Sequence, residues 1–509
     1  MSYSQSSLTI GSFLTSLSGA DGVATQTSGG FGRLYYSANT GSTWTQNTVL
    51  PSTTFTSVDL SGTTAIAVGI NTGTNTTVIR ISSSSGSSWT IPTTNVSVTA
   101  SSLYLSLSGS NAVLAVDNSG IASVYYSTNS GVDWNVSSSI NGLASSTINN
   151  ISISGVKAIA TIVSGGIVNL WYSSDSGINW TQGTNFGTVG FNSITISGNN
   201  AIIVGTQLTN GFYRYSTDAG INWNLPTGIT TPNNQLKFVS LTGSFGLIGS
   251  ITSLGVGQIY YSTDSGANWT TSDFSLSSAT SFTRLATSSP YGLASINTAT
   301  NGYVYYSGNS GANWSQKLNL AGIIVNDVEI SGLNSIAGTS TGIYYTSSTF
   351  CYEKNTLVLV VENEDEVYKK VSDLKVGDSV KTYKNGNKKV KFIRSFNYKP
   401  LNKDSDMHYL YKLKGYDVIV TGGHSLLVNK LSKQEKLNNN KYDFDETIED
   451  KKLLLACSSD KFEKIEDDLE YELWHFALES DDIHKHYGVY INDGILSESC
   501  SQAIILKML

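Results

Sequence analysis

The sequence predicts an all-β protein, with an eight-bladed β-propeller over residues 1–350 and a small all-β domain over residues 351–509. Two observations carry this prediction. One eight-residue motif recurs seven times at nearly constant spacing, and its last copy ends at Trp314. By contrast, all three cysteines and all five histidines lie after residue 350. The chain therefore divides into a chemically quiet repeat region and a smaller region equipped for thiol chemistry.

The recurring motif has the form S-x-[D/N/S]-x-G-x-x-W, and its first copy runs from Ser37 to Trp44. Successive tryptophans are separated by 45, 45, 46, 43, 46 and 45 residues. A fixed period in this range is typical of repeat architectures. Each repeat also carries four short runs of β-branched or aromatic residues between Gly, Ser and Asn turns, without helical periodicity. Four strands in about 45 residues predict one propeller blade per repeat.

The two ends of the repeat region predict how the ring closes. After Trp314 the pattern runs once more, and it stops before another tryptophan. At the other end, counting back from the Ser18–Gly19 pair places residues 2–10 in the phase of a fourth strand. We expect this segment to complete the last blade, because closure removes exposed strand edges. Seven full repeats and one shared repeat then make eight blades.

The motif is expected to form the turn between the third and fourth strands of each blade. Its Asp or Asn can accept hydrogen bonds from backbone N–H groups, and its Gly supplies a positive φ. Its Trp buries a large apolar area beside the next strand. Ser84 stands at the acid position in the second copy, so we expect a looser turn there. The motif resembles the Asp-box (BNR) repeat of sialidases, sortilin-type receptors and related propellers.

The resemblance to sialidases does not extend to their catalytic groups. Sialidases need three arginines around the substrate carboxylate and a Tyr/Glu nucleophile pair. This region has four arginines and a single glutamate, Glu329, and three of its acids occupy the acid position of the motif: Asp175, Asp218 and Asp264. We therefore expect a propeller that binds a glycan or a protein, or has a surface-structural role, and is not an enzyme. A glycan-acting propeller is the alternative.

Charge and composition limit the kinds of partner and the cellular location that we expect. Residues 1–350 carry seven basic and ten acidic side chains, and residues 351–509 carry 24 and 28. Neither part is net basic, which argues against nucleic acid as a partner. No signal peptide and no membrane span are visible, so synthesis in the cytoplasm is expected. The Ser/Thr/Asn-rich and Asn/Lys-rich parts together resemble proteins of large DNA viruses, which implies a virion or virus-surface component.

The second domain carries four ordered motifs. It opens with Cys351, continues through L-x-V-G-D-x-V ending at Val380, then T-x-x-H from Thr421 to His424, and ends with N-x-G-x-L beginning at Asn492. In this order the motifs resemble a Hint domain, the fold shared by hedgehog autoprocessing domains and inteins. The resemblance covers about Cys351 to Cys500.

The resemblance implies a single-turnover, self-cleaving cysteine protease. The thiol of Cys351 would attack the preceding carbonyl, that of Phe350, through a five-membered ring, and would form a thioester. By resemblance, His424 protonates the leaving amine and Thr421 orients the scissile peptide. No cofactor or metal is needed. The acyl acceptor would be water or a small nucleophile.

The end of the domain departs from splicing inteins. Glu498 and Ser499 stand where such inteins carry His-Asn, and serine has no side-chain amide to cyclise. We therefore expect cleavage without splicing. Cys500 is either an acyl acceptor by thioester exchange or a buried thiol. The roles of three histidines stay open, and their spacing is weak for zinc: His475, His484 and His486. A Hint domain that no longer cuts, in an intact structural protein, is the further alternative.

Overall fold

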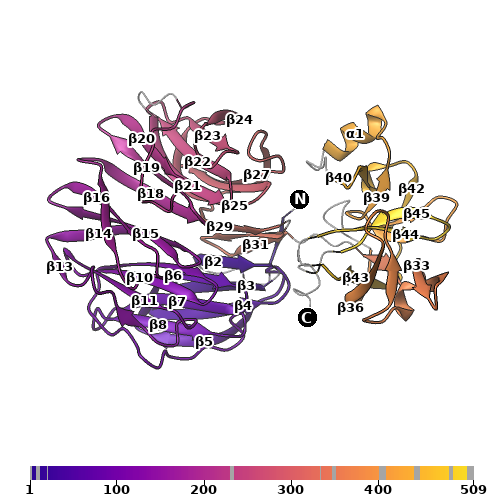
Figure 1. Ribbon diagram of the computed structural model, residues 1–509, viewed down its shortest axis with the longest axis horizontal. Helices are drawn as coiled ribbons and strands as arrows, with labels where there is room; N and C mark the ends of the chain where they lie inside the picture. The colour runs from indigo at the N-terminus through magenta and orange to yellow at the C-terminus, as the bar shows by residue number, and fades with distance from the viewer. Residues whose placement is uncertain are drawn as a thin grey trace. The chain divides into compact units, whose positions relative to one another are not determined.

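The computed structural model describes residues 3–6, 8, 12–19, 21–229, 234–332, 334–346, 351–400, 409–440, 447–480, 485–500 and 502 (Figure 1). The chain forms two compact units, Tyr3–Thr346 and Ser347–Leu509. Regular structure is almost entirely β-strand, with the α-helix α1 at Lys433–Asn440 and 3₁₀ turns at Val371–Asp373 and Ala456–Ser458. The predicted all-β class is confirmed.

The first unit consists of eight antiparallel sheets, which are the blades of a propeller (Figure 1). Blades one and two hold β2 (Phe13–Ser18), β3 (Asp21–Ser28), β4 (Phe31–Ser37) and β5 (Thr45–Pro51), then β6 (Thr53–Ser61), β7 (Thr64–Asn71) and β8 (Thr77–Ser82). Blades three and four hold β9 (Ser102–Ser108), β10 (Asn111–Asp117), β11 (Ile121–Ser127), β12 (Asn135–Val136) and β13 (Leu143–Ala144), then β14 (Ser146–Ser154), β15 (Lys157–Ser164), β16 (Ile167–Ser173) and β17 (Thr181–Asn185).

The remaining blades repeat this order. Blades five and six hold β18 (Gly190–Ser197), β19 (Asn200–Gln207) and β20 (Asn210–Ser216), then β21 (Asn234–Thr242), β22 (Phe245–Thr252), β23 (Gly257–Ser262) and β24 (Thr270–Leu276). Blades seven and eight hold β25 (Ala279–Ser288), β26 (Tyr291–Thr298), β27 (Asn301–Ser307) and β28 (Ser315–Ala321), then β29 (Val325–Ser331), β30 (Asn334–Thr339), β31 (Ile343–Thr346) and β1 (Ser4–Gln5). The predicted eight-bladed propeller is confirmed.

Blades two and five have three strands instead of the expected four. Where the fourth strand would run, one bridge joins Ile81 to Thr90 in blade two, and another joins Tyr215 to Asn224 in blade five. In each case a proline follows two residues after the bridge, Pro92 and Pro226 respectively. Proline lacks the N–H that a strand ladder needs. The expectation of four strands in every repeat is therefore wrong for these two blades.

The start of the chain supplies the outermost strand of blade eight. In β1, Ser4 and Gln5 pair antiparallel with Tyr345 and Tyr344 of β31. The pairing continues past the strand, because Ser6 N–H donates to the Ile343 carbonyl oxygen at 2.9 Å. The last sheet is thus built from both ends of the repeat region, and β31 is not left as an open edge. Of residues 2–10, positions 2, 7, 9 and 10 lie outside the described residues.

A repeated hydrogen bond joins each blade to the next. The N–H of the glycine in the first turn of a blade donates to the serine hydroxyl that ends the first strand of the preceding blade. The pairs, at 2.9–3.1 Å, are Gly62–Ser18, Gly109–Ser61, Gly155–Ser108, Gly198–Ser154, Gly243–Ser197, Gly332–Ser288 and, across the closure, Gly19–Ser331. Between blades six and seven, Thr242 Oγ1 donates to the Thr287 carbonyl instead. The recurring Ser-Gly pairs therefore connect neighbouring blades.

The eight-residue motif forms the turn between third and fourth strands, as expected. In the fourth copy, Asp175 Oδ1 accepts from Asn179 N–H at 3.0 Å and from Ser173 Oγ at 2.8 Å. Gly177 has φ +87°, and its carbonyl accepts from the Trp180 indole N–H at 2.9 Å. The motif thus closes on itself and buries its tryptophan between adjacent blades.

The second unit is one continuous set of 14 paired strands, and α1 contacts β41. In sheet order these are β40 (Thr447–Ile448), β41 (Lys451–Leu455), β39 (Ser425–Val428), β45 (Ile495–Glu498), β44 (Gly488–Ile491), β33 (Leu357–Glu362), β35 (Ser379–Lys381), β36 (Asn387–Tyr398), β43 (Tyr471–Leu478), β32 (Tyr352–Glu353), β38 (Ile419–Thr421), β37 (Leu410–Leu413) and β42 (Phe462–Ile465), with β34 (Asp365–Lys370) beside β33. Its core gathers aliphatic residues of most of these strands around Tyr352 and Phe476. This arrangement is consistent with the small all-β domain that the sequence predicts.

Candidate functional site

Cys351 is held by two backbone interactions with Thr421. The Cys351 N–H donates to Thr421 Oγ1 at 3.2 Å, and the Thr421 N–H donates to the Cys351 carbonyl at 3.3 Å. Both residues are fully buried. The following strand, β32, lies between β43 and β38, so strand pairing fixes the position of the thiol. Phe350, on the other side of the expected cleavage site, lies outside the described residues.

The imidazole of His475 lies between two thiols. Its Nε2 is 3.2 Å from Cys351 Sγ, and its Nδ1 is 3.4 Å from Cys500 Sγ. The ring is fully buried and stacks on Phe396, with ring centroids 5.4 Å apart and an interplanar angle of 20°. A neutral imidazole has one N–H and one lone pair, so it can donate to one thiol while accepting from the other. The two cysteines thus share a single acid–base group.

His424 takes a different position. Its Nε2 is 3.0 Å from Ser497 Oγ, and that hydroxyl donates to the Ser425 carbonyl. The network therefore assigns the ring hydrogen to Nε2 and the lone pair to Nδ1. Burial lowers the pKa of His424 to about 3, and His475 acts in the same direction. Backbone groups of Glu498 and Cys351 oppose this shift. His424 is consequently neutral at physiological pH.

Both thiols are protonated at neutral pH. Burial raises the pKa of Cys351 well above its ordinary value, the neighbouring Cys500 adds to this, and the hydrogen bond with Thr421 opposes it. Burial also raises the pKa of Cys500, and the charge of Glu498 acts in the same direction. The thiolate is the nucleophilic form, so a neighbouring base is required to generate it. His475 is the group in direct contact with both sulfur atoms.

The segment before Cys500 is fixed by Tyr487, the residue that precedes β44, and by its other surroundings. The Ser499 N–H donates to the Tyr487 carbonyl at 2.8 Å, and the Tyr487 N–H donates to Ser499 Oγ at 3.1 Å. His486 Nδ1 lies 3.0 Å from the Ser499 carbonyl oxygen. The side chain of Glu498 is buried and accepts from the Ser425 N–H at 2.8 Å. His484 lies outside the described residues.

Of the four site residues expected from the sequence, Cys351 and Cys500 contact His475, and Thr421 contacts Cys351. His424 instead contacts Ser497, and its backbone N–H donates to the Thr421 carbonyl at 2.9 Å. The sequence offered a weak signal for His475, which shares a face of β43 with Leu473 and Ala477, and all three are buried. Strand alternation alone does not say which thiol lies opposite, so its place between two cysteines was not predicted.

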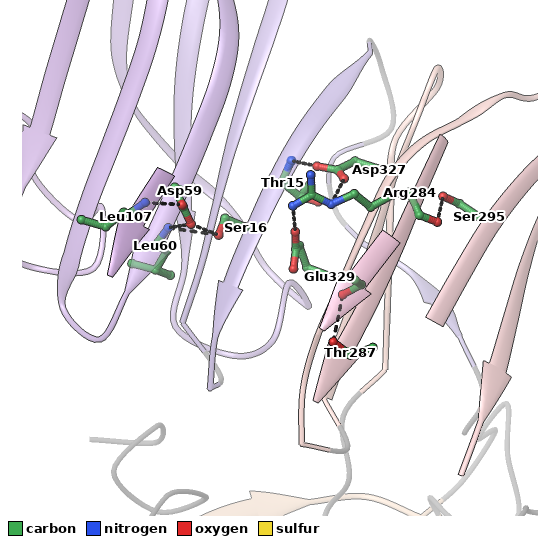
Figure 2. Close-up of polar contacts among 11 residues, drawn as sticks. Thr15, Ser16, Asp59, Leu60, Leu107, Arg284, Thr287, Ser295, Asp327 and Glu329 are labelled. Carbon is green, nitrogen blue, oxygen red and sulfur yellow. Dashed lines mark hydrogen bonds and ion pairs between the residues drawn. The ribbon is translucent and has the colours of Figure 1, made fainter. Parts of the chain in front are cut away.

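A second polar cluster lies on the first strands of the propeller blades (Figure 2). Arg284 of β25 lies between two carboxylates of β29, with Glu329 Oε1 at 2.8 Å and Asp327 Oδ1 at 3.7 Å. Asp327 Oδ2 also accepts from the Thr15 N–H of blade one at 3.1 Å. Asp59 of blade two accepts from the Leu107 N–H of blade three at 2.9 Å. We call Asp59, Arg284, Asp327 and Glu329 the axial cluster.

The axial cluster lines a cavity of about 210 Å³. Burial raises the pKa of Glu329 to about 7; Arg284 opposes this shift, while Asp327 and Asp59 add to it. Burial also raises the pKa of Asp59 and Asp327. The sequence held a signal for this cluster. Glu329 and Asp327 lie three and five residues before Gly332, and Asp59 lies three before Gly62, so all three lie on one face of their strands.

The described part of the chain contains no group of three or more His, Cys, Asp or Glu side chains arranged to hold a metal ion. Within the same residues, no helix has the length and apolar character needed to cross a membrane.

Comparisons with known proteins found similar chains among solved structures. No protein-family model matches the chain. The curated proteins likewise contain no match. Among solved structures, YCF48 bound to D1 peptide is 14% identical, with a TM-score of 0.39, over 67% of this chain and 93% of that one. The Dos1 propeller is 12% identical, with a TM-score of 0.45, over 68% and 94%.

A third solved structure, the GH74 xyloglucanase from Xanthomonas campestris, is 12% identical, with a TM-score of 0.42, over 66% of this chain and 59% of that one. At such identities the likeness concerns the fold alone.

Proposed function

We propose that residues 351–509 are a Hint-type domain that cuts the Phe350–Cys351 bond in cis and releases residues 1–350 as a binding or surface-structural propeller. The observation that carries the proposal is the pair of contacts at Cys351. Its amide nitrogen meets Thr421 Oγ1 at 3.2 Å, and its sulfur meets His475 Nε2 at 3.2 Å. An N-to-S acyl shift needs both contacts, one at the leaving nitrogen and one at the nucleophile.

The reaction balances without a cofactor. His475 takes the thiol proton, and Cys351 Sγ bonds to the Phe350 carbonyl carbon. The carbon–nitrogen bond then breaks, and the nitrogen of Cys351 takes a proton as it leaves. That proton balances the one His475 took from the thiol, and His424, which is neutral, can relay it to the amine. Water or an added thiol then opens the thioester and releases the propeller.

Splicing is not part of the proposal. Asparagine cyclisation would need a side-chain amide at residue 499, and Ser499 has a hydroxyl whose oxygen accepts from Tyr487 N–H. Transfer of the acyl group from Cys351 to Cys500 would therefore end in a branched product or in hydrolysis. Cleavage at the Phe350–Cys351 bond should therefore separate residues 1–350 from the rest of the chain without rejoining them to another segment.

Intact mass spectrometry of the full chain tests the proposal. Dithiothreitol should release residues 1–350 from the wild-type protein over hours. Cys351→Ala should remain uncut at this bond. Cys457→Ala is the matched control, because it removes the third thiol of the same unit, and it should behave as wild type. Full-length wild-type protein after days in thiol would refute self-cleavage.

A second candidate function is an uncut protein whose propeller is purely structural. One observation favours it: the charged groups of the axial cluster are used to join blades. Asp327 holds Thr15, Asp59 holds Leu107, and Arg284 pairs with Glu329. A ligand for the axial cavity would have to compete with these bonds. Saturable binding of a glycan or a peptide, lost in Arg284→Ala without loss of folding, would decide against this second candidate.

A further inference from the structure

We propose that the Ser499–Cys500 bond is a second site of N-to-S acyl shift, at which the thiol of Cys500 attacks the Ser499 carbonyl. The proposal shares His475 with the proposed function, but it concerns a different bond and a different nucleophile. An added thiol would then release the C-terminal peptide that begins at Cys500.

The carbonyl of this bond is already polarised. A carbonyl oxygen can only accept, so His486 Nδ1, 3.0 Å away, must carry the hydrogen and donate it. The side-chain oxygen Oε2 of Glu498 also lies near this nitrogen of His486, at 3.9 Å. A donor aimed at the carbonyl oxygen stabilises the charge that develops there when a nucleophile adds.

The nucleophile and the scissile peptide are held in place. Ser499 exchanges two hydrogen bonds with Tyr487, and Cys500 forms a parallel bridge with Ala477 of β43. Ser499 is fully buried and Cys500 is 1% exposed. Because the thiol belongs to the residue that follows the Ser499 carbonyl, its attack closes a five-membered ring, as in the proposed attack of Cys351.

The base is the second nitrogen of His475, at 3.4 Å from Cys500 Sγ. It takes the thiol proton, and the sulfur–carbon bond forms. The carbon–nitrogen bond of Ser499–Cys500 breaks, and the nitrogen of Cys500 takes a proton. An external thiol then exchanges with the thioester, which leaves residues 1–499 as a new thioester and frees the peptide. No oxidant or metal enters the balance.

One ring cannot serve both thiols at once. When Nδ1 of His475 holds the lone pair, Nε2 carries the hydrogen, and the reverse tautomer serves Cys351. The two cleavages therefore compete for the same base. Removing the Cys351 thiol should leave the second cleavage intact or faster, by up to about the twofold expected from a shared tautomer population.

The test uses the full chain with Cys351→Ala, incubated with dithiothreitol at pH 8 and followed by intact mass. We expect loss of the peptide Cys500–Leu509, with residues 1–499 recovered as the dithiothreitol thioester or its hydrolysis product. Cys351→Ala combined with Cys500→Ala should abolish that loss, and combination with His486→Ala should slow it by ~10²–10³-fold. A thiol is preferable to hydroxylamine, which also cleaves Asn–Gly bonds, here at Asn141, Asn210, Asn301 and Asn385.

Each outcome is decisive. The proposal is overturned if Cys351→Ala and Cys351→Ser proteins with unchanged thermal unfolding release no peptide, even if wild type is cut at Cys351. Release that persists without Cys500 also overturns it. Release at Cys500 in a protein that never cuts at Cys351 supports this inference and refutes the proposed function, so the two are separable.

Discussion

At the scale of single residues, His475 organises the candidate site. It is fully buried, contacts both Cys351 and Cys500, and stacks on Phe396. The sequence predicted Cys351, Thr421 and Cys500 from their order along the chain. It did not predict His475 as the common partner of the two cysteines, because that contact depends on how β43 pairs with β32, which is set by the folded sheet and not by any local motif.

We predict that His475→Ala slows thiol-induced release of residues 1–350 by ~10²–10⁴-fold, because it removes the base in contact with Cys351. His424→Ala should also slow release, since it removes the group proposed to protonate the amine. The rates are measured by densitometry of denaturing gels over time. Equal rates in wild type and His475→Ala would assign the thiol proton to another group.

The pH dependence of release follows from the raised pKa of Cys351. Well below its pKa, the thiolate fraction grows about tenfold per pH unit, so the rate should rise by about that factor per unit between pH 6 and 8. Single-turnover rates at fixed dithiothreitol thiolate concentration check this. A rate that is flat over this interval would show that thiol deprotonation does not limit the reaction.

The raised pKa of Glu329 leads us to predict a second pH effect, on the stability of the folded protein. Its pKa is raised to about 7 in the folded state by burial, against the opposing charge of Arg284. The folded protein therefore holds this proton more tightly than the unfolded chain. The resulting stabilisation is fully present below the unfolded pKa of ~4.3 and is lost as pH rises through about 7. The difference in Tm between wild type and Glu329→Gln should change between pH 6 and 8, and a constant difference would contradict the assignment.

At the scale of elements, the eight-residue turn was predicted almost completely. Its acid, glycine and tryptophan have local roles, and local roles can be read from sequence spacing. The number of strands was less predictable. In blades two and five, Pro92 and Pro226 leave a single bridge where a fourth strand was expected. These prolines were visible in the sequence, but the regular repeat led us to expect a fourth strand in every blade.

The copies of the eight-residue turn also differ in how much their third residue stabilises the fold. Asp175 accepts three hydrogen bonds, two from Asn179 and one from Ser173. We predict that Asp175→Ala lowers the free energy of unfolding by ~1–3 kcal/mol, because it leaves a backbone N–H without its acceptor. Chemical denaturation gives this value.

Ser84 occupies the same position in the second copy, and its hydroxyl contacts Ser88 Oγ at 2.9 Å and Ser82 Oγ at 3.3 Å. Ser84→Ala should therefore cost less than Asp175→Ala. Equal costs for the two variants would show that the acid adds nothing to the turn.

At the scale of the whole molecule, the count of eight blades follows from sequence phasing alone. The axial cluster could not be predicted from the sequence in this way, although its members share a face of their strands. Arg284 and Asp59 are 225 positions apart in the chain, and only closure of the ring brings such residues to one cavity. Pattern arguments reach neighbours on one strand, whereas this cavity depends on the number of blades and on their order around the ring.

Closure also makes a prediction. Deleting residues 1–8 removes β1 and leaves β31 as an open edge. We expect a lower Tm and concentration-dependent association through that edge. Light scattering and thermal unfolding check both effects, with Asn47→Ala, on β5 of blade one, as a control that keeps the closure. An unchanged, monomeric deletion variant would show that β1 is dispensable.

The hydrogen bond from Gly19 to Ser331 joins residues 312 positions apart. During synthesis at ~5–20 residues per second, the first blade must therefore wait roughly 15–60 s before its last neighbour leaves the ribosome. Throughout that time β2 has no neighbour on the closing side, and the segment that becomes β1 has no strand to join. Cys351 is made only a few residues after β31. Under the proposed function, the propeller becomes able to close at about the moment when the chain starts to make the domain that would set it free.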